Sequence, residues 1–265
     1  MLSQAKDFYN ESEELYKILV HLASSALNTE TLFKNWTFND IVRHLYVWNY
    51  AANLSLLDGD SWKNFSTKIN EHVNTGKELK KFEINLLEGI EEKALLKLWK
   101  NSYELLYENF KNENPKRRIK WVGPDMSVIS SISARHMETW AHGQAIYDVL
   151  KIKRINRDSI INIVIIGNNT FKWSYLVNNN KVPIEAPFLK LVSPSGKIWE
   201  FNNRKNSNKI EGLAEDFCKV VTQVRNIKDV NLKLEGDIAK EWMAIAQCFA
   251  GKANRPPAPG VRKIL

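Results

Sequence analysis

Histidine is scarce in this chain, and two of its five histidines follow a carboxylate by four residues. The two pairs are Asp40–His44 and Glu138–His142. With 30 acidic residues in 265, chance would place roughly 0.6 such pairs, so the spacing alone is weak evidence. Residues four apart share one face of a helix, where a carboxylate oxygen and an imidazole nitrogen can reach the same metal ion. The two pairs are therefore candidate ligands for a divalent metal.

The neighbours of these residues favour an interior position. His44 stands among Leu45, Tyr46, Val47 and Trp48, and Glu138 and His142 share a helix face with aromatic and apolar residues. A histidine and a carboxylate in such a core must be paired, hydrogen-bonded or metal-bound. Bundles commonly build such sites between facing helices. A site of His44, Glu138 and His142 is one interpretation, and hydrogen-bonded core histidines are the alternative.

The other titratable residues have simpler explanations. Thr37 and Asp40 have the spacing of a capping box, so Asp40 is expected at a helix start, or else as an outer partner of the metal ligands. His136 lies two positions before Glu138 and so on another face, where we expect it at the surface or at the rim of the site. His21 and His72 are expected to be structural.

Helices must position these residues. Apolar spacing and turn residues predict helices over residues 3–26, 38–57, 61–82, 84–112 and about 128–150. Asp58-Gly59-Asp60 ends the second helix, and a loop containing Pro115, Gly123 and Pro124 precedes the last. Long helices with short connections and no strand pattern predict an up-and-down bundle over residues 1–152.

Residues 153–253 mix strands and helices, which predicts a small α/β domain and an α+β chain of two domains. Alternating apolar runs flank Pro194-Ser195-Gly196, as in a β-hairpin. Helices are expected over 212–224 and 237–250, with Gly251 past the end, and a strand over 229–236. The run 160–167 fits a strand or a buried helix. Residues 254–265 form a Pro-rich tail that we expect to be extended.

Bulk composition narrows the class of protein. The net charge of +8 raises the odds of an anionic partner, but the lysines are mixed with glutamates along amphipathic stretches, which does not favour nucleic-acid binding. Neither a signal peptide nor a membrane span is predicted, so we expect a cytoplasmic protein without a membrane partner. Two cysteines, Cys218 and Cys248, are too few for a disulfide framework and are expected to be buried.

Two stretches resemble a known family. Residues 36–45 (WTFNDIVRHL) and above all 134–143 (ARHMETWAHG) are similar to the DinB-like helical family. The closer match is its mycothiol-dependent maleylpyruvate isomerase-like branch. The segments PSGKIWEF, DFCKVVTQVRN and EWMAIAQCFAG resemble the second domain of one subgroup. The resemblance implies a DinB-like bundle followed by a small sterol-carrier-like α/β domain, and favours a helix over 160–167. An acidic residue common near Ala145 in that family is absent here.

The resemblance also implies a chemistry. In that branch, a histidine of the second helix and a Glu-x-x-x-His pair of the last bundle helix bind zinc, with water in the fourth position. These ligands map onto His44, Glu138 and His142, with Zn²⁺ as the expected ion and Ni²⁺ or another divalent metal as the alternative. A low-molecular-weight thiol would be the cosubstrate, activated as a metal-bound thiolate for isomerisation or S-transfer on a small electrophilic metabolite.

Further residues are candidates for ligand binding. Trp48, Met137 and Trp140 are candidates for an apolar wall, with core packing as the alternative. Arg225 is a candidate catalytic residue for an anionic substrate or thiol carboxylate, with a solvated helix-end arginine as the alternative. A metal-dependent hydrolase at the same site and a non-enzymatic RNA- or ligand-binding module are the rival functions. A homodimer is compatible with either.

Overall fold

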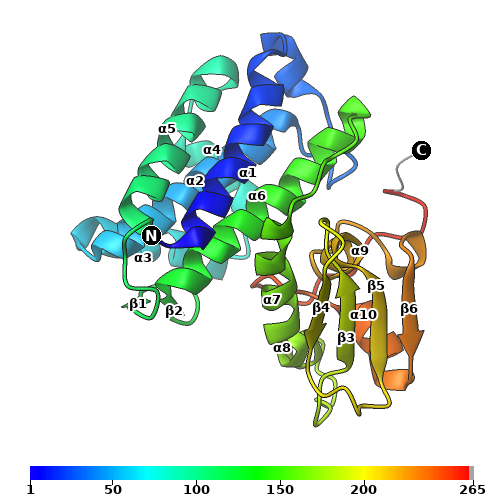
Figure 1. The fold of residues 1–265 in the computed structure, drawn as a ribbon. Helices are drawn as coiled ribbons and strands as arrows, with labels where there is room; N and C mark the ends of the chain where they lie inside the picture. The colour runs from blue at the N-terminus through cyan, green and yellow to red at the C-terminus, as the bar shows by residue number, and fades with distance from the viewer. Residues whose placement is uncertain (263–265) are drawn as a thin grey trace. The chain divides into compact units, whose positions relative to one another are not determined.

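A computed structural model describes residues 1–262 and divides the chain into two compact units (Figure 1). The first spans Met1–Ile146 and the second begins at Tyr147. The division falls inside the helix that was expected to end near Leu150, a few residues before the predicted boundary at 152/153. A helical first part followed by a small sheet domain confirms the predicted fold class.

The first unit is built almost entirely from helices. Helix α5 packs against both α1 and α2, and its fully buried Trp99 and Tyr103 lie in the core. Burial of such large apolar surfaces is the main force that holds the bundle together. The elements of this unit are α1 (Ser3–Val20), α2 (Phe38–Leu57), α3 (Asp60–Asn74), α4 (Leu79–Leu86), α5 (Glu92–Phe110), β1 (Arg118–Ile119), β2 (Met126–Ser127) and α6 (Val128–Leu150), whose last turn belongs to the second unit.

The start of α2 confirms the predicted capping box. The backbone N–H of Asp40 donates to the Thr37 hydroxyl at 3.1 Å, and the Thr37 N–H donates to the Asp40 carboxylate at 2.9 Å. Two backbone donors that the helix leaves unpaired are thereby satisfied. Asp58 ends the helix in the left-handed conformation, with φ of 47°, as the Asp-Gly-Asp sequence predicted. The residues that position His44 on α2 are therefore local in sequence.

The helices predicted over 61–82 and 84–112 were wrong in their boundaries. Three helices occupy this region: Gly76, with φ of +73°, follows the C-cap of α3, and Gly89, with φ of +76°, lies in the turn between α4 and α5. Only glycine adopts this backbone conformation without steric cost. The expectation of no strands was also wrong in one place, where β1 and β2 form a short antiparallel pair before α6.

The second unit contains a four-stranded sheet in the order β4-β3-β5-β6. The predicted hairpin is confirmed as the antiparallel pair β3–β4, with Gly196 at φ of +84° in its turn. Strands β3 and β5 are parallel, and α9 packs against both of them. The elements are α7 (Ile161–Asn169), α8 (Phe171–Val177), β3 (Phe188–Val192), β4 (Ile198–Phe201), β5 (Lys209–Leu213), α9 (Ala214–Val221), β6 (Leu232–Glu235) and α10 (Asp237–Ile245).

The helices and strands of the second unit can be compared with those predicted from the sequence. The run 160–167 lies in a helix, mainly α7, as the resemblance suggested. Strand β5 was not predicted, because its five residues carry no clear alternation. Helix α10 ends at Ile245 rather than near Gly251, since the next backbone N–H groups bond elsewhere: Gln247 donates to the Ser174 hydroxyl and Cys248 to the Val221 carbonyl.

The chain beyond α10 is anchored to the second unit as far as it is described. Asn226 donates to the Pro257 carbonyl at 2.8 Å, and the Gly260 N–H donates to the Asp229 carboxylate at 2.9 Å. The last three residues of the predicted tail lie outside the described residues. Cys218 and Cys248 are buried, as expected, and neither forms a disulfide with a described residue. Within residues 1–262, no helix has the length and apolar character needed to cross a bilayer.

Candidate metal centre

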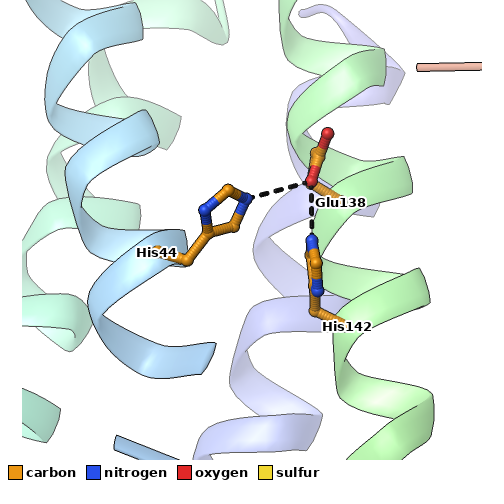
Figure 2. Close-up of side chains that lie close together, drawn as sticks. All are labelled: His44, Glu138 and His142. Carbon is orange, nitrogen blue, oxygen red and sulfur yellow. Dashed lines mark hydrogen bonds and ion pairs between the residues drawn. The ribbon is translucent and has the colours of Figure 1, made fainter. Parts of the chain in front are cut away.

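His44 of α2 and Glu138 and His142 of α6 point toward one another (Figure 2). One carboxylate oxygen, Oε2 of Glu138, lies 3.0 Å from Nε2 of His142 and 3.3 Å from Nε2 of His44. One potential ligand atom from each residue lies within 4.8 Å of the other two. The four-residue spacing places Glu138 and His142 on one face of α6, and the packing of the bundle brings His44 of α2 to them.

The donor set fits a divalent transition metal such as zinc. Two imidazole nitrogens and one carboxylate oxygen are ligands that zinc binds at about 2.0–2.2 Å. Three protein ligands leave a coordination position for a molecule from outside the chain, which distinguishes catalytic from structural zinc sites. The Glu138 and His142 side chains retain 18% and 13% exposure, so the centre is in contact with solvent.

A fourth residue at the centre, Glu83 of α4, was not anticipated from the sequence. Its Oε1 lies 2.7 Å from Nδ1 of His44 and accepts a hydrogen bond from the indole N–H of Trp48 at 3.0 Å. Glu83 is only 1% exposed. Ligating histidines commonly donate their second N–H to a carboxylate, which fixes the tautomer and the ring orientation. In the sequence, the position of Glu83 next to Phe82 in an amphipathic segment is the feature that could have indicated a buried carboxylate.

The two carboxylates dominate the electrostatics of His44. Burial by itself lowers the pKa of His44, but the negative charge of Glu83 and hydrogen bonds to Glu138 and Glu83 raise it to about 9. Burial opposes the charge of Glu138, yet hydrogen bonds from His142 and His44 hold the pKa of Glu138 well below its usual range. Burial lowers the pKa of His142. In the metal-free protein at neutral pH, His44 is therefore an imidazolium between two carboxylates.

Aromatic rings enclose the centre from both sides. The Trp36 ring stacks on His142, with centroids 5.7 Å apart and an interplanar angle of 6°, and Phe33 meets the same imidazole edge-on at 4.9 Å. Both residues come from the loop that precedes α2. The Trp48 ring lies 6.2 Å from the His44 ring, and its role as a wall residue for a ligand stays a prediction. These rings limit water at the imidazoles and hold their orientations.

The sequence of the first unit matches a known protein family. The model of the Mycothiol maleylpyruvate isomerase N-terminal domain family matches residues 8–147. The chain belongs to this family. Two uncharacterized proteins of Mycobacterium tuberculosis, MT0041 of strain CDC 1551 and Rv0036c of strain H37Rv, are each 29% identical to it over 249 residues. These alignments cover 94% of this chain and 96% of each relative.

Solved structures show the same fold. The crystal structures of a mycothiol-dependent maleylpyruvate isomerase and of a histidine mutant of such an enzyme match with TM-scores of 0.51 and 0.50. Each match covers 82% of this chain and 87% of the solved chain, at 12% sequence identity. At this identity the likeness establishes the fold of the maleylpyruvate isomerase family, including its second domain, and leaves the chemistry to the residues themselves.

Two other candidate wall residues lie elsewhere on the bundle of this maleylpyruvate isomerase family member. Met137 is 3% exposed and Trp140 is fully buried. Each residue of a helix is rotated by about 100° from the one before, so both point away from the face that carries Glu138 and His142. Core packing, the alternative reading, accounts for their burial, and a role in ligand binding stays a prediction.

Arg225 lies inside the second unit of the chain. Its guanidinium donates to Asp148 at 2.7 Å and to the Val224 carbonyl at 3.1 Å, and the residue is 3% exposed. Such a buried, charge-assisted pair is a structural tie within this unit. The expectation of a solvated helix-end arginine is therefore wrong, and the role of Arg225 toward an anionic substrate stays a prediction.

Two further expectations are settled by the bundle. His136 was expected at the surface or the rim, but it is completely buried, with Nε2 3.9 Å from Oε2 of Glu11 on α1. The prediction was wrong because α6 is covered on several faces, so a face away from the centre is still interior. Asp40 is the helix-start residue: its carboxylate bonds Thr37, Arg43 and Lys80.

Proposed function

We propose that this chain is a divalent-metal-dependent enzyme, with zinc as the first candidate, that activates a low-molecular-weight thiol. The thiol would serve isomerisation of, or S-transfer to, a small electrophilic metabolite. The observation that carries the proposal is the convergence of His44, Glu138 and His142 within 4.8 Å of one another. Membership of the maleylpyruvate isomerase family and the fold shared with mycothiol-dependent enzymes support it.

Each residue of the centre has a defined task in this proposal. His44 and His142 bind through Nε2 as neutral imidazoles, and Glu138 contributes one negative charge. A divalent ion held there lowers the pKa of a coordinated thiol and so supplies a nucleophile at neutral pH. Glu83 accepts the Nδ1–H of His44 and keeps Nε2 directed at the centre. Trp48 holds Glu83 in place through its indole N–H.

The partial exposure of the centre fits a small-molecule reaction. Glu138 and His142 are accessible on one side, while Trp36 and Phe33 cover the His142 ring. A thiolate is more nucleophilic when water is kept from it. The Trp36 and Phe33 rings would limit water around a thiolate held at this centre, and the exposed edges of Glu138 and His142 would admit the electrophile. We therefore propose that the substrate is a small metabolite rather than a macromolecule.

Metal analysis combined with thiol binding tests this proposal. Protein purified without chelators should carry about one zinc or nickel per chain. After cobalt substitution, addition of a thiol should produce a sulfur-to-cobalt charge-transfer band, and conversion of an electrophile such as maleylpyruvate should require the thiol. Protein without metal would refute the site. Turnover that does not depend on thiol would instead identify the hydrolase, and salt-sensitive RNA retention would identify a binding module.

A further inference from the structure

Arg135 is a buried arginine one helical turn before Glu138 on α6. It is 6% exposed, and its guanidinium carbon lies 5.6 Å from the centre of the Trp121 ring. Trp121 in turn contacts Trp48, with ring centroids 5.7 Å apart. Residues three apart lie on the same helix face. Arg135 therefore stands beside the metal centre, on the side of Glu138 that Trp48 and Trp121 border.

This guanidinium has no ionic partner in the described part of the chain. The other two buried arginines there are neutralised: Arg43 lies 3.1 Å from the Asp40 carboxylate, and Arg225 lies 2.7 Å from that of Asp148. For Arg135, no carboxylate of residues 1–262 lies within 4 Å, and its guanidinium donates no hydrogen bond to any of these residues. It interacts with Glu138 only at longer range. A buried charge in this state is costly to keep.

The charge balance of the metal-bound centre indicates which kind of ligand Arg135 would bind. Glu83 and Glu138 contribute two negative charges, which a divalent ion balances when His44 and His142 are neutral. Arg135 then leaves the centre with one excess positive charge. A partly buried site with an excess positive charge favours an anionic ligand over a neutral one. The guanidinium lies over the Trp121 ring, and its N–H donors, which bond none of residues 1–262, can bind a planar anion.

We infer that Arg135 forms an anion subsite next to the metal centre and binds a carboxylate group of a small ligand. This inference rests on the proposed function and adds a recognition residue to it. A guanidinium pairs with a carboxylate through two parallel hydrogen bonds, which gives both affinity and orientation. The carboxylate belongs either to the thiol or to the electrophile, and the two sources can be separated by experiment.

Matched ligands test the inference by isothermal titration of zinc-loaded protein. In the thiol arm, 3-mercaptopropionate is compared with 3-mercaptopropionamide, and in the electrophile arm maleate is compared with its monoamide. We expect the wild type to prefer the acid in at least one arm by about tenfold or more. Arg135→Gln should abolish this preference, and Arg135→Lys should retain part of it. Arg118→Gln removes an exposed arginine of the same unit and should leave the preference unchanged.

The outcomes separate the subsite from the rest of the proposal. Zinc content equal to that of wild type in Arg135→Gln, with the acid preference lost, supports the subsite. An acid preference that persists in Arg135→Gln overturns it, as does a wild type with no preference in either arm. If neither thiol binds zinc but maleate still binds through Arg135, the thiol chemistry fails and the subsite stands. Should Arg135→Gln not fold, Arg135→Lys replaces it: a reduced acid preference supports the subsite, and a preference equal to that of wild type overturns it.

Discussion

Nδ1 of His44 lies 2.7 Å from Oε1 of Glu83, and the same oxygen accepts the indole N–H of Trp48. The partners come from α2 and α4, so this contact ties the short helix α4 to the centre. The opposite nitrogen of His44 faces Glu138 at 3.3 Å. One imidazole thus has a supporting carboxylate on one side and a ligand carboxylate on the other.

Replacing the supporting carboxylate should weaken the metal site without removing a ligand. Glu83→Gln keeps the size of the side chain but removes the charge that makes His44 a strong ligand. We expect metal affinity to fall about 10- to 100-fold, measured by competition with a chelating dye. Glu88→Gln, at an exposed position following α4, is the matched control. Equal affinities in the two variants would show that Glu83 does not support the ligand.

Removal of a metal ligand should reduce metal binding more than Glu83→Gln does, while leaving the fold intact. His142→Ala deletes one of three donors, and we expect stoichiometric metal binding to be lost while helix content remains near that of wild type. Circular dichroism and elemental analysis measure the two properties on one sample. His21→Ala, at the exposed end of α1, should retain the metal. Global unfolding of the His142 variant would point to a structural role for this residue instead.

Metal binding should release a proton near neutral pH. The pKa of His44 in the metal-free protein is raised to about 9, so the ring is protonated at pH 7 and must lose its proton to bind an ion. Because the pKa values of His142 and Glu138 are lowered, these two ligands contribute little to the number of protons released. We expect about one proton per ion at pH 7, measured by titration calorimetry in buffers of different ionisation enthalpy. Release of no proton would contradict a charged His44.

The same charge makes the stability of the metal-free protein depend on pH. The pKa of His44 is about 9 in the folded chain, above the ordinary histidine value of 6.5, so the folded chain binds this proton more tightly than the unfolded chain does. This stabilisation is complete below about pH 6.5 and is lost as pH rises through about 9. We expect the Tm of chelator-treated protein to fall over this window.

Metal-loaded protein and the variant Glu83→Gln are the comparisons for this effect. In loaded protein the ion replaces the proton on His44, so the fall in Tm should be smaller. In Glu83→Gln the pKa of His44 is raised less, and the alkaline loss of stability should shrink for the same reason. A Tm of metal-free wild type that stays flat from pH 6.5 to 9 would rule out the buried imidazolium.

Local sequence determined the parts of the protein that depend on neighbours along the chain. The capping box of Thr37 and Asp40 set the start of α2, and the four-residue spacing set Glu138 beside His142, because both follow from the geometry of one helix. The hairpin at Gly196 is also local, since its turn requires a residue tolerant of positive φ. His44 was a candidate third ligand from its apolar neighbours, and the resemblance favoured it, but no local rule connects it to α6.

Tertiary structure decided the rest, because packing between helices sets which side chains meet. Glu83 reaches His44 only since α4 folds back on α2, and no spacing in the sequence relates residues 39 positions apart. His136 is interior because α1 covers its face of α6. Arg43 and Arg135 each have a carboxylate three residues away, but Arg43 pairs with Asp40, whereas the packed bundle directs the Glu138 carboxylate at His44 and His142. Burial and electrostatic partnership are properties of the assembled core.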